Sequence, residues 1–199
     1  MRTALLIRHG VLADDGEERA VGAADLPMSV VGEAQVRELA ARLRARGTPD
    51  AIYCSDLARS QRTAALLTAG RDIPIRVRRE LREIDLGEWQ GLKRSELAAR
   101  WPADYAARGR DIAHFRPPGG ESFADLAARV LPCWTSIVAD RDAQVVAIAA
   151  HAGVHRVILC HVLGMSLANL FRFTQRPAAV DVVEWRKNEP VVTLVDGDR

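Results

Sequence analysis

The chain is predicted to fold as a three-layer α/β/α sandwich around a mostly parallel central sheet, as a single domain spanning residues 1–199. Two short apolar runs, Ala4 to Ile7 and Val145 to Ala150, are typical of buried parallel strands. Segments whose apolar residues recur at helical spacing alternate with such runs, as in a parallel sheet that is covered by helices on both faces. No internal repeat, linker or low-complexity segment indicates a second domain.

The first predicted strand covers Thr3 to Ile7, and an irregular acidic stretch follows it. Ser29 is suited to cap the next helix because its hydroxyl can accept a hydrogen bond from a free backbone N–H group. Gly47 marks the end of this helix. Its apolar face recurs at helical spacing through Val36, Leu39, Ala40 and Leu43.

Ala51 to Cys54 predicts the second strand, and Ser55 is expected to cap a helix that ends near Gly70. Ile73 to Val77 predicts a third, exposed strand. The region from Glu80 to Leu92 is acidic and punctuated by glycine, which indicates a connection.

In the second half, a short helix is expected from about Lys93 to Trp101. Ser122 and Asp125 resemble a capping box that opens an amphipathic helix. A strand from Gln144 to Ala150 and a helix from Gly153 to Leu163 follow. Two closing runs are predicted to pair as a hairpin: Val180 to Trp185 and Val191 to Val195, across Asn188-Glu189-Pro190.

Composition excludes several classes of function. The net charge is +2, and no basic stripe with interleaved aromatic residues is present, so we expect no nucleic-acid partner. No apolar run approaches membrane-spanning length, so we expect no membrane partner. Only Lys93 and Lys187 are lysines among the 28 basic residues, so an arginine must be singled out by its position.

A cytoplasmic location is expected. The first strand begins at Thr3 and runs into Arg8-His9, which leaves no room for a signal peptide. Cys54, Cys133 and Cys160 lack C-x-x-C spacing, which favours reduced core thiols over a disulfide framework or a zinc site.

The residues that carry chemistry stand where predicted strands end. Arg8 and His9 follow the first strand, Arg59 lies in the first turn after the second, and His151 follows the strand that begins at Gln144. Ligands of open α/β sheets bind beyond the carboxyl ends of the strands, and helix N-termini favour anions. These positions together indicate phosphoryl transfer through a histidine nucleophile, with cations around the phosphoryl oxygens.

Motifs in chain order cover nearly the whole sequence: Leu6 to Gly10, Val21 to Gly32, Ile52 to Ala64, Leu81 to Leu92, Gly119 to Ser122 and His151 to Val154. Together they resemble the histidine phosphatase superfamily, which includes the cofactor-dependent phosphoglycerate mutases. The resemblance implies that His9 is the residue phosphorylated during turnover and that Glu83 is the proton donor. It also implies a phosphate pocket made by Arg8, Arg59 and His151, with Gly22 and Ala152 in matching motifs. It implies no metal and no cofactor.

Some assignments have competitors. Glu80, Asp85 and Glu88 lie near Glu83, and only the family motif selects among these acids. His151 and His155 have the i, i+4 spacing of a zinc-binding helix, but the glutamate of H-E-x-x-H is missing, so His155 is expected to border the pocket or to be structural. His114 is a candidate contact for the leaving group, with a plain loop role as the alternative.

Departures from the family bear on the substrate. Val11-Leu12 stand where an acidic or amide residue and a hydroxyl residue are common, so one polar contact near the phosphate is expected to be lost. Asp14 to Glu18 replace the segment by which mutases recognise substrate, and this acidic stretch is expected to repel a second anionic group. The region from His151 to Phe173 looks most like alpha-ribazole phosphatases of cobalamin biosynthesis and their broad-specificity relatives.

The sequence therefore predicts a phosphomonoesterase that acts on a small phosphorylated metabolite through a phosphohistidine, with alpha-ribazole 5'-phosphate as the best single substrate. The alternatives are a phosphoglycerate mutase, and a phosphohistidine-protein phosphatase or phosphate-ligand binder in signalling. The sequence leaves the oligomeric state open, a homodimer included.

Overall fold

A six-stranded sheet forms the centre of the computed structural model, which describes residues 2–13, 19–140 and 142–197. The strand order is β3-β2-β4-β1-β5-β6. The pairs β2–β3, β2–β4 and β1–β4 are parallel, whereas β1–β5 and β5–β6 are antiparallel. The strands are β1 (Thr3–Arg8), β2 (Ala51–Cys54), β3 (Ile75–Val77), β4 (Val145–Ala150), β5 (Val180–Arg186) and β6 (Glu189–Gly197). The predicted mostly parallel sheet is confirmed.

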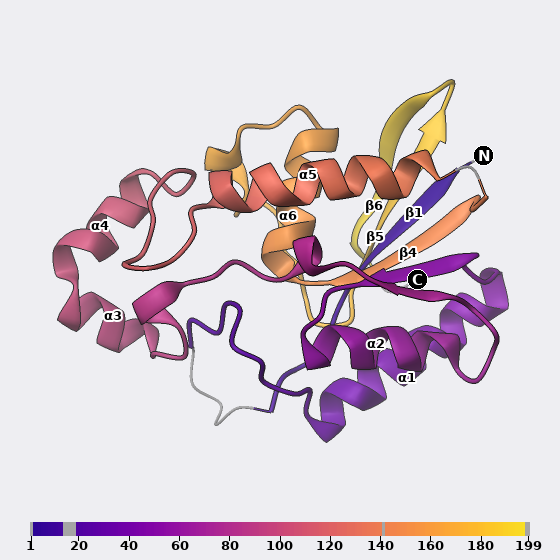
Figure 1. Ribbon diagram of the computed structural model, residues 1–199, viewed down its shortest axis with the longest axis horizontal. Helices are drawn as coiled ribbons and strands as arrows, with labels where there is room; N and C mark the ends of the chain where they lie inside the picture. Colours follow the sequence, from indigo (N-terminus) through magenta and orange to yellow (C-terminus); the bar gives the residue numbers. More distant parts are fainter. Residues whose placement is uncertain (1, 14–18, 141, 198–199) are drawn as a thin grey trace.

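Helices cover both faces of this sheet, so the three-layer prediction is also confirmed. Figure 1 shows α1 and α2 on one face and α5 and α6 on the other, with α3 and α4 set apart at the left of the view. The α-helices are α1 (Val30–Arg46), α2 (Ala58–Thr68), α3 (Arg94–Arg100), α4 (Pro102–Arg110), α5 (Phe123–Ala139) and α6 (Ala152–Val162). Three short 3₁₀ turns are η1 (Arg79–Leu81), η2 (Gly87–Trp89) and η3 (Leu167–Asn169).

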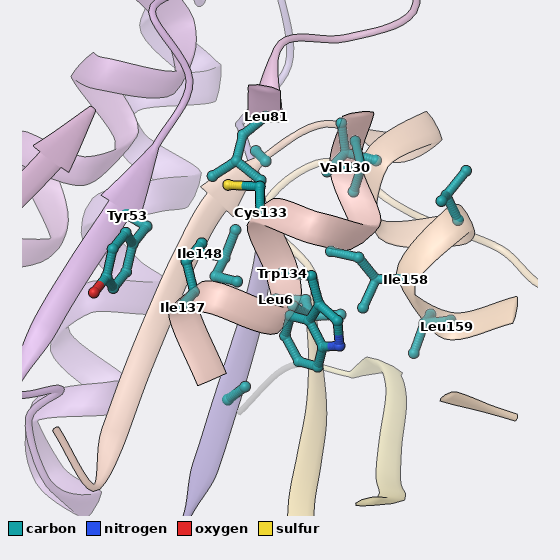
Figure 2. Packing of buried hydrophobic residues seen from close by; sticks show 14 of the residues in the cluster. Leu6, Tyr53, Leu81, Val130, Cys133, Trp134, Ile137, Ile148, Ile158 and Leu159 are labelled. Atoms are coloured by element: carbon teal, nitrogen blue, oxygen red, sulfur yellow. The ribbon is translucent and has the colours of Figure 1, made fainter. Parts of the chain in front are cut away.

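The core consists of two clusters because successive residues of a strand point to opposite faces. Leu6 packs with Leu126 and Trp134 on the α5–α6 side, and Figure 2 shows part of this cluster. Ile7 packs with Leu39 on the α1–α2 side. Burying each such side chain contributes about 1.5–3 kcal/mol, which fixes the strands that carry the site.

Most predicted element ends agree with the structure. The Ser29 hydroxyl accepts a hydrogen bond from Gly32 N, and Ser122 and Asp125 form the predicted capping box. The closing hairpin is confirmed, but its turn lies at Lys187 and Asn188, whose φ angles of 50° and 68° suit a tight hairpin turn. Glu189 and Pro190 accordingly belong to β6.

The predicted cap at Ser55 is wrong. The N-cap of α2 is Leu57, which has no side-chain capping bond, and the helix begins at Ala58. The Ser55 hydroxyl accepts instead from Leu57 N at 3.3 Å and lies 2.8 Å from Nε2 of His151. The helix α4 does not correspond to any predicted element, and it begins with Pro102 in its first turn. The acidic residues Asp14, Asp15, Glu17 and Glu18 lie outside the described residues.

Candidate active site

Neighbouring strand ends bring the predicted residues together. His9 follows β1, His151 follows β4 and is the N-cap of α6, and Arg59 lies in the first turn of α2, which follows β2. The strands β2, β4 and β1 are adjacent in the sheet. The rings of His9 and His151 meet edge to face with centroids 5.3 Å apart, and Nε of Arg59 lies 3.3 Å from Nδ1 of His151.

His9 is held in one orientation with one nitrogen available for reaction. Its Nδ1 lies 2.8 Å from the carbonyl oxygen of Gly10. Because a carbonyl only accepts hydrogen bonds, the proton of the neutral ring is on Nδ1, and Nε2 keeps its lone pair. Burial, and then the charge of Arg8, lowers the pKa of His9 to about 3, so the imidazole is neutral at pH 7.

Arg8 places a guanidinium beside His9, and one of its buried N–H groups has no acceptor among the described residues. One Nη1–H group donates to the carbonyl of Gln175. The buried Nε has no hydrogen-bond partner among the described residues. Burial lowers the pKa of Arg8. A buried charged donor without a partner is costly, and an anion at this point would satisfy it.

Arg59 is 1% exposed and is fixed by backbone carbonyls. Its Nη2 donates to the carbonyl of Gly22 at 2.8 Å, and its Nη1 donates to the carbonyl of Ala24. Gly22 therefore contributes to the site by orienting Arg59 and by lining the adjacent cavity.

His151 is fully buried and both of its ring nitrogens are engaged. Arg59 Nε–H donates to Nδ1, so the ring proton is on Nε2 and points to the Ser55 hydroxyl at 2.8 Å. Burial, with the charge of Arg59 adding to it, lowers the pKa of His151 well below its ordinary value. Ser55 is the residue of this site that sequence reasoning missed, because its place before a helix suggested a cap.

Glu83 docks on the N-terminus of α6. Its Oε2 accepts from Gly153 N at 3.1 Å, and its Oε1 accepts from Ile84 N at 3.0 Å. A Cβ atom at Gly153 would lie 2.3 Å from Oε1, so a larger residue at this position would displace the carboxylate from its present place. Glu83 faces the charges of Arg8 and Arg59.

A cavity of about 190 Å³ lies beside Glu83, and Gly22 and Ala152 also line it. The competing acids Glu80, Asp85 and Glu88 are exposed and are not among its lining residues. Glu83 therefore both lines this cavity and faces Arg8 and Arg59, whereas Glu80 and Asp85 line a separate hollow that Glu83 also borders.

His155 lies one helical turn after His151, whose carbonyl accepts its backbone N–H at 3.0 Å, whereas His114 lies apart from these contacts. His155 is fully buried, and burial lowers its pKa to about 3. His114 is exposed, lies 3.1 Å from Oδ1 of Asp111 through its Nδ1, and does not line the cavity beside Glu83. Its contact with a leaving group has no support in this structure. Across residues 2–13, 19–140 and 142–197, no group of His, Cys, Asp and Glu has an arrangement that could hold a metal ion.

Comparisons with known proteins place the chain in a family and match its fold. The family model for the histidine phosphatase superfamily (branch 1) matches residues 4–197. A 2,3-bisphosphoglycerate-dependent phosphoglycerate mutase of Methylobacterium radiotolerans is 36% identical over 85% of this chain and 82% of its own. An adenosylcobalamin/alpha-ribazole phosphatase of Salmonella typhimurium is 30% identical over 90% of each chain. The crystal structure of the alpha-ribazole phosphatase from Shigella flexneri superposes with a TM-score of 0.90 at 24% identity, covering 98% of this chain and 96% of that one.

Within the helices that the structure describes, none combines the length and apolar character needed to span a bilayer.

The buried histidines predict acid-sensitive folding. In the folded chain the pKa of His155 is about 3, below its ordinary value of 6.5, so the unfolded chain binds a proton that the folded chain excludes. This contribution to the free energy of unfolding is fully present above pH 6.5 and is lost as the pH falls toward 3. The loss amounts to about 2 kcal/mol at pH 5. Between pH 7 and pH 5, the free energy of unfolding measured with denaturant should therefore fall by about 2 kcal/mol less in His155→Gln than in the unsubstituted protein. His161→Gln, which removes an exposed histidine, is the control variant. Equal pH dependence in His155→Gln and the unsubstituted protein would contradict the buried, neutral state of His155.

Proposed function

The chain belongs to the histidine phosphatase superfamily (branch 1), and from that premise we propose that it hydrolyses small phosphomonoesters through a phosphohistidine on His9. The observation that carries the proposal is the state of His9, which is buried, neutral and free at Nε2 beside Arg8. The unpartnered Nε–H of Arg8 supports a phosphoryl oxygen at the same point.

In the first half of the proposed reaction, the Nε2 lone pair of His9 attacks phosphorus in line with the leaving oxygen. The Nε2–P bond forms as the P–O bond breaks, and Glu83, which enters this step in its protonated form and regains that proton from water in the second half, gives the proton to the departing alkoxide. Free N–H groups of Arg8 and Arg59 bind the equatorial oxygens, where negative charge gathers. The Gly10 carbonyl accepts the Nδ1–H throughout and stabilises the phosphoimidazole ring.

In the second half, Glu83 as a carboxylate takes a proton from water. The resulting hydroxide attacks phosphorus, the Nε2–P bond breaks, and inorganic phosphate leaves with His9 neutral again. The hydrogen bonds from Gly153 and Ile84 fix the Glu83 carboxylate in the place where both proton transfers occur.

The substrate and setting form the finer part of the proposal. Likeness over residues 151–173, together with the Salmonella relative, supports alpha-ribazole 5'-phosphate as the first metabolite to test. A cytoplasmic location fits the three buried free thiols Cys54, Cys133 and Cys160.

A mutase reaction is the second candidate, because the Methylobacterium relative is the more identical of the two curated relatives compared above. Hydrolysis is favoured because apolar Val11 and Leu12 follow Gly10, which removes a polar contact that would help to hold a transferred phosphoryl group. With 3-phosphoglycerate as substrate and a catalytic amount of 2,3-bisphosphoglycerate as phosphoryl donor, we expect inorganic phosphate in stoichiometric yield and almost no 2-phosphoglycerate. Chromatography of the products gives the ratio directly, and dominant interconversion would replace the phosphatase assignment with a mutase.

The phosphohistidine can be trapped. Acid-labile, base-stable phosphate should appear on His9 when turnover is stopped by rapid denaturation in base and the peptides are sequenced by mass spectrometry. His9→Ala should lower kcat by at least about 10⁴-fold with no loss of fold, because the nucleophile is gone. His114→Ala should label normally. Retained turnover in His9→Ala would sink the proposed intermediate.

Glu83→Gln tests the proton donor. Alkyl esters have poor leaving groups and should slow by about 10²–10⁴-fold, whereas activated aryl esters should slow far less, since the departing phenolate scarcely needs a proton. The ratio of kcat values for glycerol phosphate and 4-nitrophenyl phosphate measures the effect. Asp85→Asn, which changes an exposed neighbour, should leave that ratio unchanged. If both esters slow equally in Glu83→Gln, another group donates the proton.

A further inference from the structure

One side chain of α5, Arg129, holds the backbone of the loop that carries Glu83. Its Nη1 donates to the carbonyls of Glu80 and Arg82, each at 2.7 Å, and its Nη2 donates to the carbonyl of Glu83 at 3.1 Å. Residues 82–86 belong to no helix or strand, so regular secondary structure does not take up the carbonyls of Arg82 and Glu83. Arg129 supplies the partner from 46 positions beyond Glu83 in the chain.

Glu121 completes this arrangement. It receives two further N–H groups of Arg129 in a bidentate pair, Nε to Oε1 and Nη2 to Oε2, both at 2.8 Å. Its Oε2 also accepts from Asp85 N at 3.0 Å, and its backbone N–H donates to the carbonyl of Asp85 at 2.8 Å. All five N–H groups of Arg129 are thus used. Arg129 and Glu121 form a loop clamp that acts on both sides of Glu83.

Both members of the loop clamp are themselves fixed. Leu126 and Val130, three positions before and one position after Arg129 along α5, are fully buried, so this stretch of helix is anchored in the core. Burial alone would raise the pKa of Glu121, but hydrogen bonds from Arg129 and Asp85 lower it below its ordinary value. Glu121 is therefore charged at pH 7, and a bidentate pair with arginine is among the stronger hydrogen-bonded contacts in proteins.

The proposed reaction gives the loop clamp a role beyond stability. Glu83 changes charge twice, since it gives up a proton in the first half and takes one from water in the second. The attraction of its carboxylate to Arg8 and Arg59, and the two backbone hydrogen bonds that it accepts, weaken whenever the carboxyl group is protonated. The hydrogen bonds from Arg129 act at backbone carbonyls, which do not titrate.

We propose that Arg129 and Glu121 are positioning residues for the proton donor, because they fix the backbone at Glu83 and so keep its carboxyl group in place in both charge states. Both act through Glu83 and not by contact with the substrate. The proposal rests on the proposed function for the role of Glu83. A shift of about 1 Å at a catalytic group can lower a rate by about 10²-fold, so a loosened loop would weaken acid catalysis without removing the acid.

Arg129→Lys tests the proposal, because lysine keeps the positive charge but has three N–H donors in place of five and no planar fork. The measurement is the ratio of kcat/KM for glycerol phosphate to kcat/KM for 4-nitrophenyl phosphate, which reports the steps up to the phosphohistidine. The ratio should fall by at least about tenfold, as expected for Glu83→Gln, since only the alkyl ester needs a well-placed proton. Arg116→Lys is the matched control: it changes an exposed bidentate partner of Asp125 near the start of α5 and should keep the ratio.

A double-variant cycle separates positioning from a merely structural role. The Glu83→Gln protein has no acid left to misplace, so adding Arg129→Lys to it should change the ratio by less than about twofold. Two effects that multiply would show that Arg129 acts on the ratio by another route, and would overturn the proposal. Thermal unfolding checks the fold of each variant. If Arg129→Lys does not fold, Glu121→Gln takes its place, with a fall of about threefold expected because the three carbonyl contacts of Arg129 remain.

Amide hydrogen exchange, followed by NMR, gives a readout that needs no turnover. The N–H group of Gly153 lies in the first turn of α6, where no helical carbonyl is available, and it donates to Oε2 of Glu83. In Arg129→Lys this amide should exchange about tenfold faster, the factor expected from the loss of about one hydrogen bond. Arg116→Lys should keep the original exchange rate.

An unchanged ester ratio, or an unchanged exchange rate at Gly153, in a folded Arg129→Lys protein would overturn the proposal while the unsubstituted protein still hydrolyses both esters. Failure of the proposed function is a different result. In that case the unsubstituted protein would hydrolyse neither ester and His9 would carry no phosphate, and the role of Glu83 as proton donor would fall whatever the exchange rate at Gly153.

Discussion

The site depends on keeping the imidazole of His9 neutral inside a buried pocket of positive charge. Arg8 and Arg59 are both buried, and the charge of each disfavours a proton on His9. The Gly10 carbonyl then fixes the remaining ring proton on Nδ1. These effects together produce a nucleophilic nitrogen, and they produce a pocket that a doubly charged phosphate group would neutralise.

The fold supplies this arrangement through strand order. Placing β4 between β1 and β2 sets His151 between His9 and Arg59, and the start of α6 directs the Gly153 N–H group at Glu83. The carboxylate therefore reaches the cluster from a loop that is far away in sequence. Further out, α4 and the segment after η3 bring Arg108 and Phe171 together.

The strand ends were predictable from the sequence because apolar runs and helix starts are local signals. His9, Arg59 and His151 followed from these runs, and Glu83 followed only from the family motif. The role of Ser55 was not predictable, since a serine before a helix favours a cap and its contact with His151 spans 96 positions. The hydrogen bond that the Gly22 carbonyl accepts from Arg59 was also not predictable, because every residue has a backbone carbonyl and the residue type does not indicate which one is used. The helix α4 was not predicted because Pro102, two positions after the last residue of α3, is a residue that normally ends a helix.

The most direct test of this account is the ¹⁵N NMR spectrum of the His9 ring in the unliganded protein. The account predicts a neutral ring from pH 8 down to about pH 5, with the proton on Nδ1 and an unprotonated Nε2, because the pKa of His9 is lowered to about 3. His114, which is exposed, serves as an internal reference in the same spectrum. A His9 ring that is protonated at pH 7, or whose neutral form carries its proton on Nε2, would contradict the account.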